Sequence, residues 1–234
     1  FAVGLACGGT IRVLVEPIGT VMPVEVLEDL VLARESRMPV AYVTGIQAER
    51  RLVKDGYAER FRMDRSGFEE DGETFVAIHN PPLRMIIVGA VHIAQALVPM
   101  ARIAGYDPLL IDPRESFASE ERFPCETILH DWPDEGVQAF GLDQRTALVL
   151  LTHDPKLDDP ALEQALASDV FYIGALGSTR THAKRVARLE NKGFTADQIG
   201  RIHGPIGLDI GAAGPAEIAV SILAEATQVL RKGA

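Results

Sequence analysis

The stretch that decides the fold runs Arg84-Met85-Ile86-Ile87-Val88-Gly89-Ala90-Val91-His92-Ile93-Ala94. Met85 to Val88 form a short apolar run, and the glycine after them marks the point where a dinucleotide-binding fold turns from strand to helix. Compared with the fingerprint G-x-G-x-x-G/A, Gly89 and Ala94 match the first and third positions, whereas Val91 replaces the second glycine. The stretch indicates either a Rossmann-type phosphate turn that departs from the pattern at Val91 or a plain strand-to-helix turn.

Beyond this stretch, strand-like and helix-like segments alternate, which is the pattern of a parallel sheet built by right-handed crossovers. The predicted strands cover residues 84–88, 108–111, 127–129, 147–151 and 170–173. The predicted helices cover residues 92–104, 134–140, 160–167, 179–191 and 215–232. The fold class is therefore predicted to be α/β, with a Rossmann-like parallel-sheet domain over residues 83–234.

Upstream of that domain, residues 1–80 read as a smaller α+β unit. It contains predicted strands at 10–15, 40–44 and 74–78, a helix at 24–34, and a hairpin in which Asp55-Gly56 joins residues 51–53 to residues 57–61. Two prolines in Asn80-Pro81-Pro82 remove amide donors and predict the domain boundary. The chain opens at Phe1 without a methionine, so we expect the N-terminal domain to be incomplete.

Composition narrows the classes of protein. The 234 residues are 47% hydrophobic and 24% charged, as expected of a globular chain with a sizeable core. The net charge of −10 disfavours nucleic-acid binding, because phosphate neutralisation needs clustered Lys and Arg. No apolar run approaches the roughly 18 residues of a membrane span, and two distant cysteines indicate neither a disulfide framework nor a zinc site. We expect a cytoplasmic protein that binds neither membrane nor nucleic acid.

An acidic residue follows the next predicted strand, at the position where dinucleotide-binding folds carry the carboxylate that binds the ribose. Asp112 lies 23 residues after Gly89, close to the offset of about 20 at which a carboxylate takes the ribose hydroxyls. The alternative is a turn or capping aspartate ahead of Pro113. Arg114 would suit a 2′-phosphate, so the sequence leaves NAD, NADP and a mononucleotide-like ligand open.

Two more turns follow strands of the same predicted sheet, at the edge where doubly wound sheets bind ligands. They are Thr152-His153-Asp154 and Gly174-Ala175-Leu176-Gly177-Ser178-Thr179-Arg180. The second turn offers amides, hydroxyls and a guanidinium to a phosphate or other oxyanion, with ordinary N-capping as the alternative. We expect it to share one crevice with Gly89 and Asp112.

A glycine-rich loop, residues 201–211, holds His203 and Asp209 between its turns and is either a site loop or a plain route into the last helix. The residues expected to contact a bound cofactor, none of them catalytic, are Gly89, His92, Asp112, Arg114, His153, Gly174, Gly177, Ser178, Arg180, His203 and Asp209. Cys7, between glycines, is either a soft ligand or an inert buried thiol, and Cys125 is predicted to be a core residue.

Several of these motifs resemble the XdhC/CoxI family of accessory proteins for molybdenum hydroxylases. Gly4-Leu5-Ala6-Cys7-Gly8-Gly9 is similar to that family's cysteine-bearing segment. The run Tyr172 to Ser178, the segment Thr181-His182-Ala183-Lys184-Arg185 and the loop His203 to Gly211 resemble its C-terminal Rossmann domain. Departures from the family pattern are the missing Ser-Gly-Gly-Cys-type upstream motif and Val91.

The resemblance implies a function. Family members are understood to bind molybdenum cofactor, to protect it while a cysteine desulfurase supplies the sulfido ligand, and to deliver it to an apo-enzyme of xanthine dehydrogenase type. On that resemblance Cys7 becomes a candidate contact to the cofactor and its metal, and a homo-oligomer is expected. The alternative is an NAD(P)-dependent oxidoreductase with His153 or His182 as acid or base. A third reading is a docking partner of a desulfurase or hydroxylase.

Overall fold

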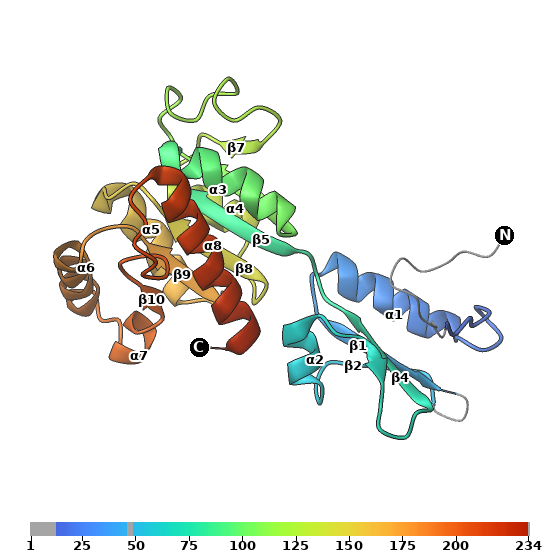
Figure 1. Ribbon diagram of the computed structural model, residues 1–234. Coiled ribbons are helices and arrows are strands. Elements are labelled where there is room, and N and C mark those ends of the chain that lie inside the picture. Colours follow the sequence, from blue (N-terminus) through green and yellow to red (C-terminus); the bar gives the residue numbers. More distant parts are fainter. Residues whose placement is uncertain (1–12, 46–48, 234) are drawn as a thin grey trace. The chain divides into compact units, whose positions relative to one another are not determined.

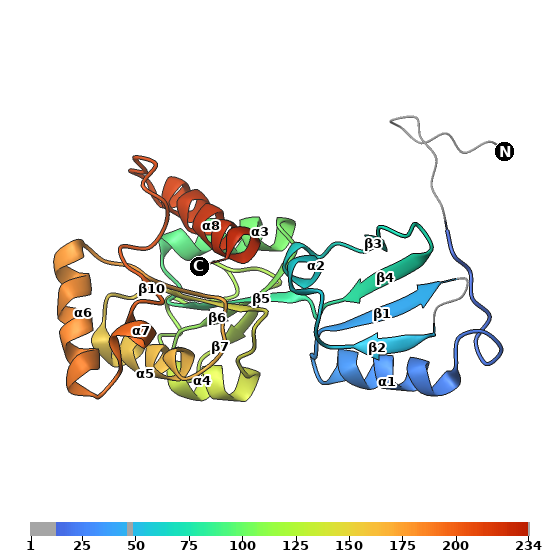
Figure 2. The same cartoon turned by 90° about the horizontal axis from the view of Figure 1, so that it is seen from below.

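The computed structural model describes residues 13–45 and 49–233, and the chain divides into two compact units, Phe1–Asn80 and Pro81–Ala234. Figures 1 and 2 show an antiparallel sheet in the first unit and a parallel sheet between helices in the second. The predicted α/β class, with a Rossmann-like sheet and a smaller α+β part, is confirmed.

The first unit is a four-stranded antiparallel sheet in the order β2-β1-β4-β3. Its strands are β1 (Val40–Gly45), β2 (Arg51–Val53), β3 (Gly67–Phe68) and β4 (Thr74–His79). Helix α1 (Val24–Glu35) packs on Val40 and Leu52, whereas Ala41 and Val43 face Tyr57 and Phe61 in a separate cluster. Alternate residues of β1 therefore serve two small apolar clusters, as the period of a strand requires.

Two predictions for this unit are wrong. Residues after Asp55-Gly56 form helix α2 (Ala58–Met63) rather than the second strand of a hairpin. Tyr57 and Phe61 are four residues apart and both pack on the cluster of Ala41, Val43 and Val76, a spacing that suits a helix lying on the sheet rather than a strand beside β2. Residues 13–15, predicted to end a strand, are exposed and outside any strand, while residues 10–12 lie outside the described part of the chain.

The second unit is a six-stranded parallel sheet in the order β10-β9-β8-β5-β6-β7. The strands are β5 (Leu83–Val88), β6 (Tyr106–Ile111), β7 (Thr127–Leu129), β8 (Thr146–Leu150), β9 (Tyr172–Ala175) and β10 (Ile202–His203). Numbered from β5, this is the doubly wound order 3-2-1-4-5-6. The order reverses between β5 and β8, and the crevice of such folds opens there, at the carboxyl ends of the strands.

Helices cover both faces of this sheet (Figure 2). Helices α3 (His92–Ile103) and α8 (Pro215–Lys232) pack on one face over Met85, Ile87 and Val149. The other face carries α4 (Pro133–Phe140), α5 (Pro155–Leu166), α6 (Thr179–Asn191) and α7 (Ala196–Ile199). Burial on both faces explains why residues 85–88 of β5, 108–111 of β6 and 147–150 of β8 are continuous apolar runs rather than alternating ones.

Helix α5 begins at Pro155, five residues before the predicted start at Pro160. The Asp154 side chain accepts a hydrogen bond from the Lys156 amide and caps the helix, and Pro155 occupies the first turn, where its missing N–H costs nothing. Pro160 then lies inside the helix, which is held by burial of Leu157, Leu162 and their neighbours. The sequence reading also missed the short elements β3, α7 and β10.

Candidate functional site

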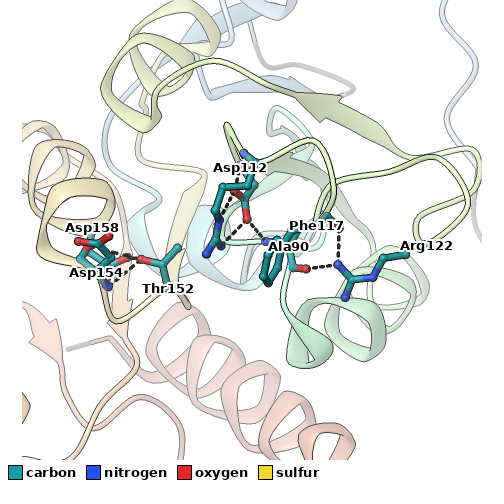
Figure 3. Close-up of polar contacts among 8 residues, drawn as sticks. Ala90, Asp112, Phe117, Arg122, Thr152, Asp154 and Asp158 are labelled. Atoms are coloured by element: carbon teal, nitrogen blue, oxygen red, sulfur yellow. Dashed lines mark hydrogen bonds and ion pairs between the residues drawn. The ribbon is translucent and has the colours of Figure 1, made fainter.

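The candidate site is the set of turns at the carboxyl edge of the six-stranded sheet. Asp112, directly after β6, is buried, and its carboxylate binds the turn after β5 and its own loop (Figure 3). Asp112 Oδ2 accepts from the Ala90 amide at 2.8 Å and from Arg114 Nη2 at 2.7 Å. Asp112 Oδ1 accepts from the Arg114 amide at 3.0 Å and from Arg114 Nε at 2.8 Å.

These four donors use the full acceptor capacity of a carboxylate. Burial alone would raise the pKa of Asp112, but the hydrogen bonds from Arg114 and from the Ala90 and Arg114 amides hold that pKa below its ordinary value of 3.8. Asp112 is therefore an ionised cross-link between two turns. This differs from the expected role, because no oxygen is left over for a ribose hydroxyl.

The backbone amides of the turn after β5 are likewise used in hydrogen bonds within the protein. The Gly89 amide donates to Ile111 O at 2.9 Å, and the Ala90 amide is taken by Asp112. Gly89 has a φ of +108°, and a Cβ there would lie 2.7 Å from the Thr152 side chain, so protein packing alone requires the glycine. Together with Val91 at the second fingerprint position, these contacts do not support a nicotinamide dinucleotide held in the usual manner.

Arg114 is fixed as firmly as its partner. Its fork is bound by Asp112, and the guanidinium carbon lies 4.2 Å from the centre of the Phe117 ring. The hydrogen bonds that Arg114 donates to Asp112, and more weakly the charges of Asp154 and Asp158, raise the pKa of Arg114 above its ordinary value. Arg114 therefore stays a cation of fixed orientation.

The turn after β8 is built on Thr152. Its hydroxyl donates to Asp158 Oδ1 at 2.6 Å and accepts from the Asp154 amide at 3.1 Å (Figure 3). His153, between them, is exposed and has a φ of +62°. Thr152 therefore ties the turn to α5, while the imidazole of His153 stays on the surface.

A second acid–arginine pair lies beside this turn. Asp158 and Arg185 are both buried, and Asp158 Oδ2 lies 3.8 Å from Arg185 Nη2, which donates to Leu176 O at 3.0 Å. Asp158 Oδ2, Arg185 Nε and Arg185 Nη1 have no hydrogen-bond partner among the described residues. Burial raises the pKa of Asp158 and lowers that of Arg185. The sequence reading missed this pair, although a charge four residues before Leu189 on the buried face of α6 was a signal.

Glycines of the turn after β9 are also explained by packing. A Cβ on Gly174 would lie 2.5 Å from Ile206 and 2.6 Å from the Tyr172 hydroxyl, and a Cβ on Gly177 would lie 2.9 Å from Thr181. Ser178 caps α6 by accepting from the Thr181 amide at 3.2 Å. The capping alternative is thus observed for Ser178, while its role toward a ligand stays a prediction.

The glycine-rich loop is organised by Glu225 of α8. Glu225 Oε2 accepts from the Tyr172 hydroxyl at 2.6 Å and from the Gly207 amide at 2.8 Å, and Glu225 Oε1 lies 3.2 Å from His203 Nδ1. Burial and the Glu225 carboxylate raise the pKa of Tyr172 well above 10.0. Burial alone would raise the pKa of Glu225, but these hydrogen bonds lower it. Tyr172 and Glu225 were missed, although a carboxylate three residues after Ile222 on the apolar face of α8 indicated a buried partner.

The other residues that were predicted to contact a cofactor do not take part in these clusters. His92, Arg180 and Asp209 are exposed, and Cys7 lies outside the described residues. Cys125 is exposed with a φ of +63°, so its assignment to the core is wrong. It lies in a turn whose left-handed backbone keeps the thiol on the surface.

The described residues form neither a metal cluster nor a membrane-spanning helix. Within residues 13–45 and 49–233, no group of three or more His, Cys, Asp or Glu side chains is placed to hold a metal ion. In the same part of the chain, no helix is both long and apolar enough to cross a membrane.

The strand order and the carboxyl-edge turns define a Rossmann-type α/β domain. The family described as XdhC Rossmann domain matches residues 85–226, which is more than half of the chain. This protein therefore belongs to the XdhC family.

Relatives are found among curated proteins and solved structures. The chain is 30% identical over 230 residues to the molybdenum cofactor insertion chaperone PaoD of Escherichia coli (strain K12), covering 98% of this chain and 62% of PaoD. It is 31% identical over 175 residues to the uncharacterized protein YqeB of the same strain, covering 72% of this chain and 32% of YqeB.

A crystal structure of a protein described as a xanthine dehydrogenase from Bacillus halodurans matches with a TM-score of 0.65 and 26% identity, over 88% of this chain and 64% of that chain. The chain thus spans from about a third to about two thirds of the lengths of these relatives.

Proposed function

We propose that this protein binds molybdenum cofactor as cargo and delivers it to an apo-enzyme of xanthine dehydrogenase type. The observation that carries the proposal is the 30% identity to the insertion chaperone PaoD along 98% of this chain. Identity of this extent runs through both compact units, so it covers more than a shared Rossmann fold.

The carboxyl edge of the sheet offers groups suited to such a cargo. Arg114 presents a guanidinium whose orientation Asp112 fixes, and Arg185 and Asp158 hold buried polar atoms for which the described residues supply no hydrogen-bond partner. A cofactor that carries both a phosphate and a heterocycle has acceptors and donors to meet such groups. By contrast, Asp112 has no capacity left for a ribose, which disfavours the oxidoreductase reading.

The finer part of the proposal is that the protein holds the cofactor while a cysteine desulfurase supplies its sulfido ligand. Cys7 is the candidate contact to the metal, on the resemblance of its glycine-flanked segment. A thiolate is the nucleophilic and metal-binding form of cysteine, and it suits a soft metal centre.

Mass spectrometry of the protein purified from cells that make molybdenum cofactor tests binding. We expect a pterin to co-purify in proportion to bound molybdenum, and delivery to appear as activation of a cofactor-free hydroxylase. Co-purification of a nicotinamide nucleotide, with no pterin, would overturn the proposal in favour of an oxidoreductase.

The role of Cys7 is tested by comparing Cys7→Ala with Cys125→Ala. We expect Cys7→Ala to lower molybdenum content per protein, and Cys125→Ala to leave it unchanged because that thiol is exposed. Equal molybdenum content in both variants would contradict the proposed contact between Cys7 and the metal, while the proposal that the protein binds the cofactor would stand.

A further inference from the structure

The loop after β6 carries a flat, immobilised pair of side chains. The Arg114 guanidinium lies 4.2 Å from the centre of the Phe117 ring, and the Phe117 amide donates to Arg114 O at 2.8 Å, which closes the turn beneath the pair. Because Asp112 binds Arg114 at both Nε and Nη2, the plane of the guanidinium is set by two hydrogen bonds. Neither side chain depends on a ligand for its orientation.

A third side chain fastens this pair to the crevice. Arg122 Nη1 donates to Ala90 O at 2.8 Å and also to Phe117 O, and the Arg122 guanidinium lies 5.9 Å from the Phe117 ring centre (Figure 3). Ala90 belongs to the turn between β5 and α3, so the loop after β6 is tied to the first turn of the predicted crevice. The pair therefore stands at the carboxyl edge of the sheet.

The pair remains open to solvent despite these contacts. The Arg114 side chain is 37% exposed and Phe117 is 40% exposed, whereas Asp112, which holds Arg114, is buried. The Arg114 fork is bound by Asp112, and its guanidinium carbon lies over the Phe117 ring. Each of the two side chains therefore keeps part of its surface open to a ligand.

This geometry favours one kind of ligand group. Asp112 neutralises the charge of Arg114, which weakens the attraction for a phosphate, but a partly exposed guanidinium beside a partly exposed ring can still stack on a planar group. Bases stack on aromatic rings and on guanidinium planes with little dependence on their identity. The negative charges of Asp154 and Asp158 also act on Arg114, and carboxylates are acceptors for ring N–H groups.

We propose that the Arg114–Phe117 pair is a stacking platform for a planar heteroaromatic ring, a pterin or a nucleobase, of the ligand in this crevice. The inference rests on the proposed function in that it names the part of the cargo that the Rossmann domain recognises. It also goes beyond the ribose and 2′-phosphate roles that the sequence suggested for Asp112 and Arg114. The acid orients the arginine, and the arginine contacts the ring.

The test is direct binding of two probes to the purified chain, pterin-6-carboxylic acid by its fluorescence and cytidine monophosphate by calorimetry. Arg114→Lys keeps the charge but removes the plane, and Phe117→Leu keeps an apolar side chain and leaves the Asp112–Arg114 pair intact. We expect each to weaken one or both probes about tenfold, the size of a lost stacking contact. The probe that responds identifies the ring as pterin or nucleobase.

Arg102→Lys is the matched control, because Arg102 is an exposed arginine in the last turn of α3 that pairs with Glu126. We expect it to bind both probes within about twofold of wild type, within the ordinary scatter of surface changes. Thermal midpoints of all variants separate lost binding from lost folding. Wild-type affinity in both Arg114→Lys and Phe117→Leu, or no binding of either probe by wild type, would overturn the platform. Co-purification of a pterin in that case would leave the proposed function standing.

Discussion

Two acid–arginine pairs lie at the carboxyl edge of the same sheet, and they differ in how completely their hydrogen bonds are made. Asp112 and Arg114 are joined at 2.7 Å and 2.8 Å, and every lone pair of the acid is used. Asp158 and Arg185 approach only to 3.8 Å, and atoms on both sides lack a partner among the described residues. We refer to them as the closed pair and the open pair.

The difference follows from where the partners come from. Asp112 and Arg114 are two residues apart in one turn, so local backbone geometry brings them together. Asp158 belongs to α5 and Arg185 to α6, so their separation is set by how two helices pack on the sheet. The pKa of the acid is lowered in the closed pair and raised in the open pair. The closed pair is therefore a structural cross-link, whereas the open pair has buried polar atoms whose hydrogen bonds are not made among the described residues.

The largest expected effect is that of Asp112→Asn on the free energy of unfolding. The substitution replaces one acceptor oxygen by an amide that faces the donors of Arg114 and Ala90, and we expect a loss of about 3 kcal/mol, the lower end for a broken buried pair because Arg114 is partly exposed. Urea unfolding measures it, with Asp209→Asn, an exposed acid, as the control. A loss below about 1 kcal/mol would show that the closed pair is not a cross-link.

Double-mutant cycles compare the two pairs directly. One cycle combines Asp112→Asn with Arg114→Gln, and the other combines Asp158→Asn with Arg185→Gln. We expect a coupling energy of about 2 kcal/mol in the closed pair and below about 1 kcal/mol in the open pair, since only the first has direct hydrogen bonds. Equal coupling energies would erase the distinction.

The stability difference between wild type and Asp112→Asn should depend on pH. The folded pKa of Asp112 lies below 3.8, so the stabilisation is fully present above 3.8 and is lost as the pH falls through the folded pKa. Urea unfolding from neutral pH to below 3.8 measures the trend. A difference that stays constant across that range would mean that the Asp112 charge adds nothing.

The smallest expected effect is that of Asp158→Asn, within about 1 kcal/mol at neutral pH, because Oδ2 has no hydrogen bond to lose. Its pH trend is the reverse. The folded pKa of Asp158 is raised above 3.8, so its contribution is present below 3.8 and is lost as the pH rises through the folded pKa. The free energy of unfolding of Asp158→Asn should therefore rise relative to that of wild type as the pH increases from acid toward neutral. The opposite trend would contradict burial of an unsatisfied charge at Asp158.

Much of the parallel-sheet unit could be predicted from the sequence. The apolar runs of β5, β6 and β8, and the helices α3, α6 and α8, lie at or within a few residues of their predicted positions. Burial on both faces leaves such strands little alternative. The strand β10 was missed because two residues carry no periodic signal, and α2 was read as a strand because the turn pair Asp55-Gly56 was weighed above the four-residue spacing of Tyr57 and Phe61.

Less of the candidate site could be predicted. Spacing indicated Asp112 and Arg114 as a pair of interest, but not that they satisfy each other. The glycines at 89, 174 and 177 are predicted to contact a cofactor, and the structure adds a packing reason for each, because a Cβ there would lie too close to a protein side chain. Asp158, Arg185 and Glu225 gave only the weak signal of a charge on the buried face of a helix.

The sequence by itself determined most strands and helices of the parallel-sheet unit and the residues that fall at its carboxyl edge, and its motifs indicated the family. The elements follow from local periodicity and chain direction, and parallel strands bring their ends to one edge whatever the packing. The tertiary structure alone decided which of those residues hydrogen-bond to one another and which keep polar atoms without a partner among the described residues or side-chain surface exposed to solvent. Hydrogen-bond capacity is settled by distances between elements, such as the 3.8 Å between a side chain of α5 and one of α6.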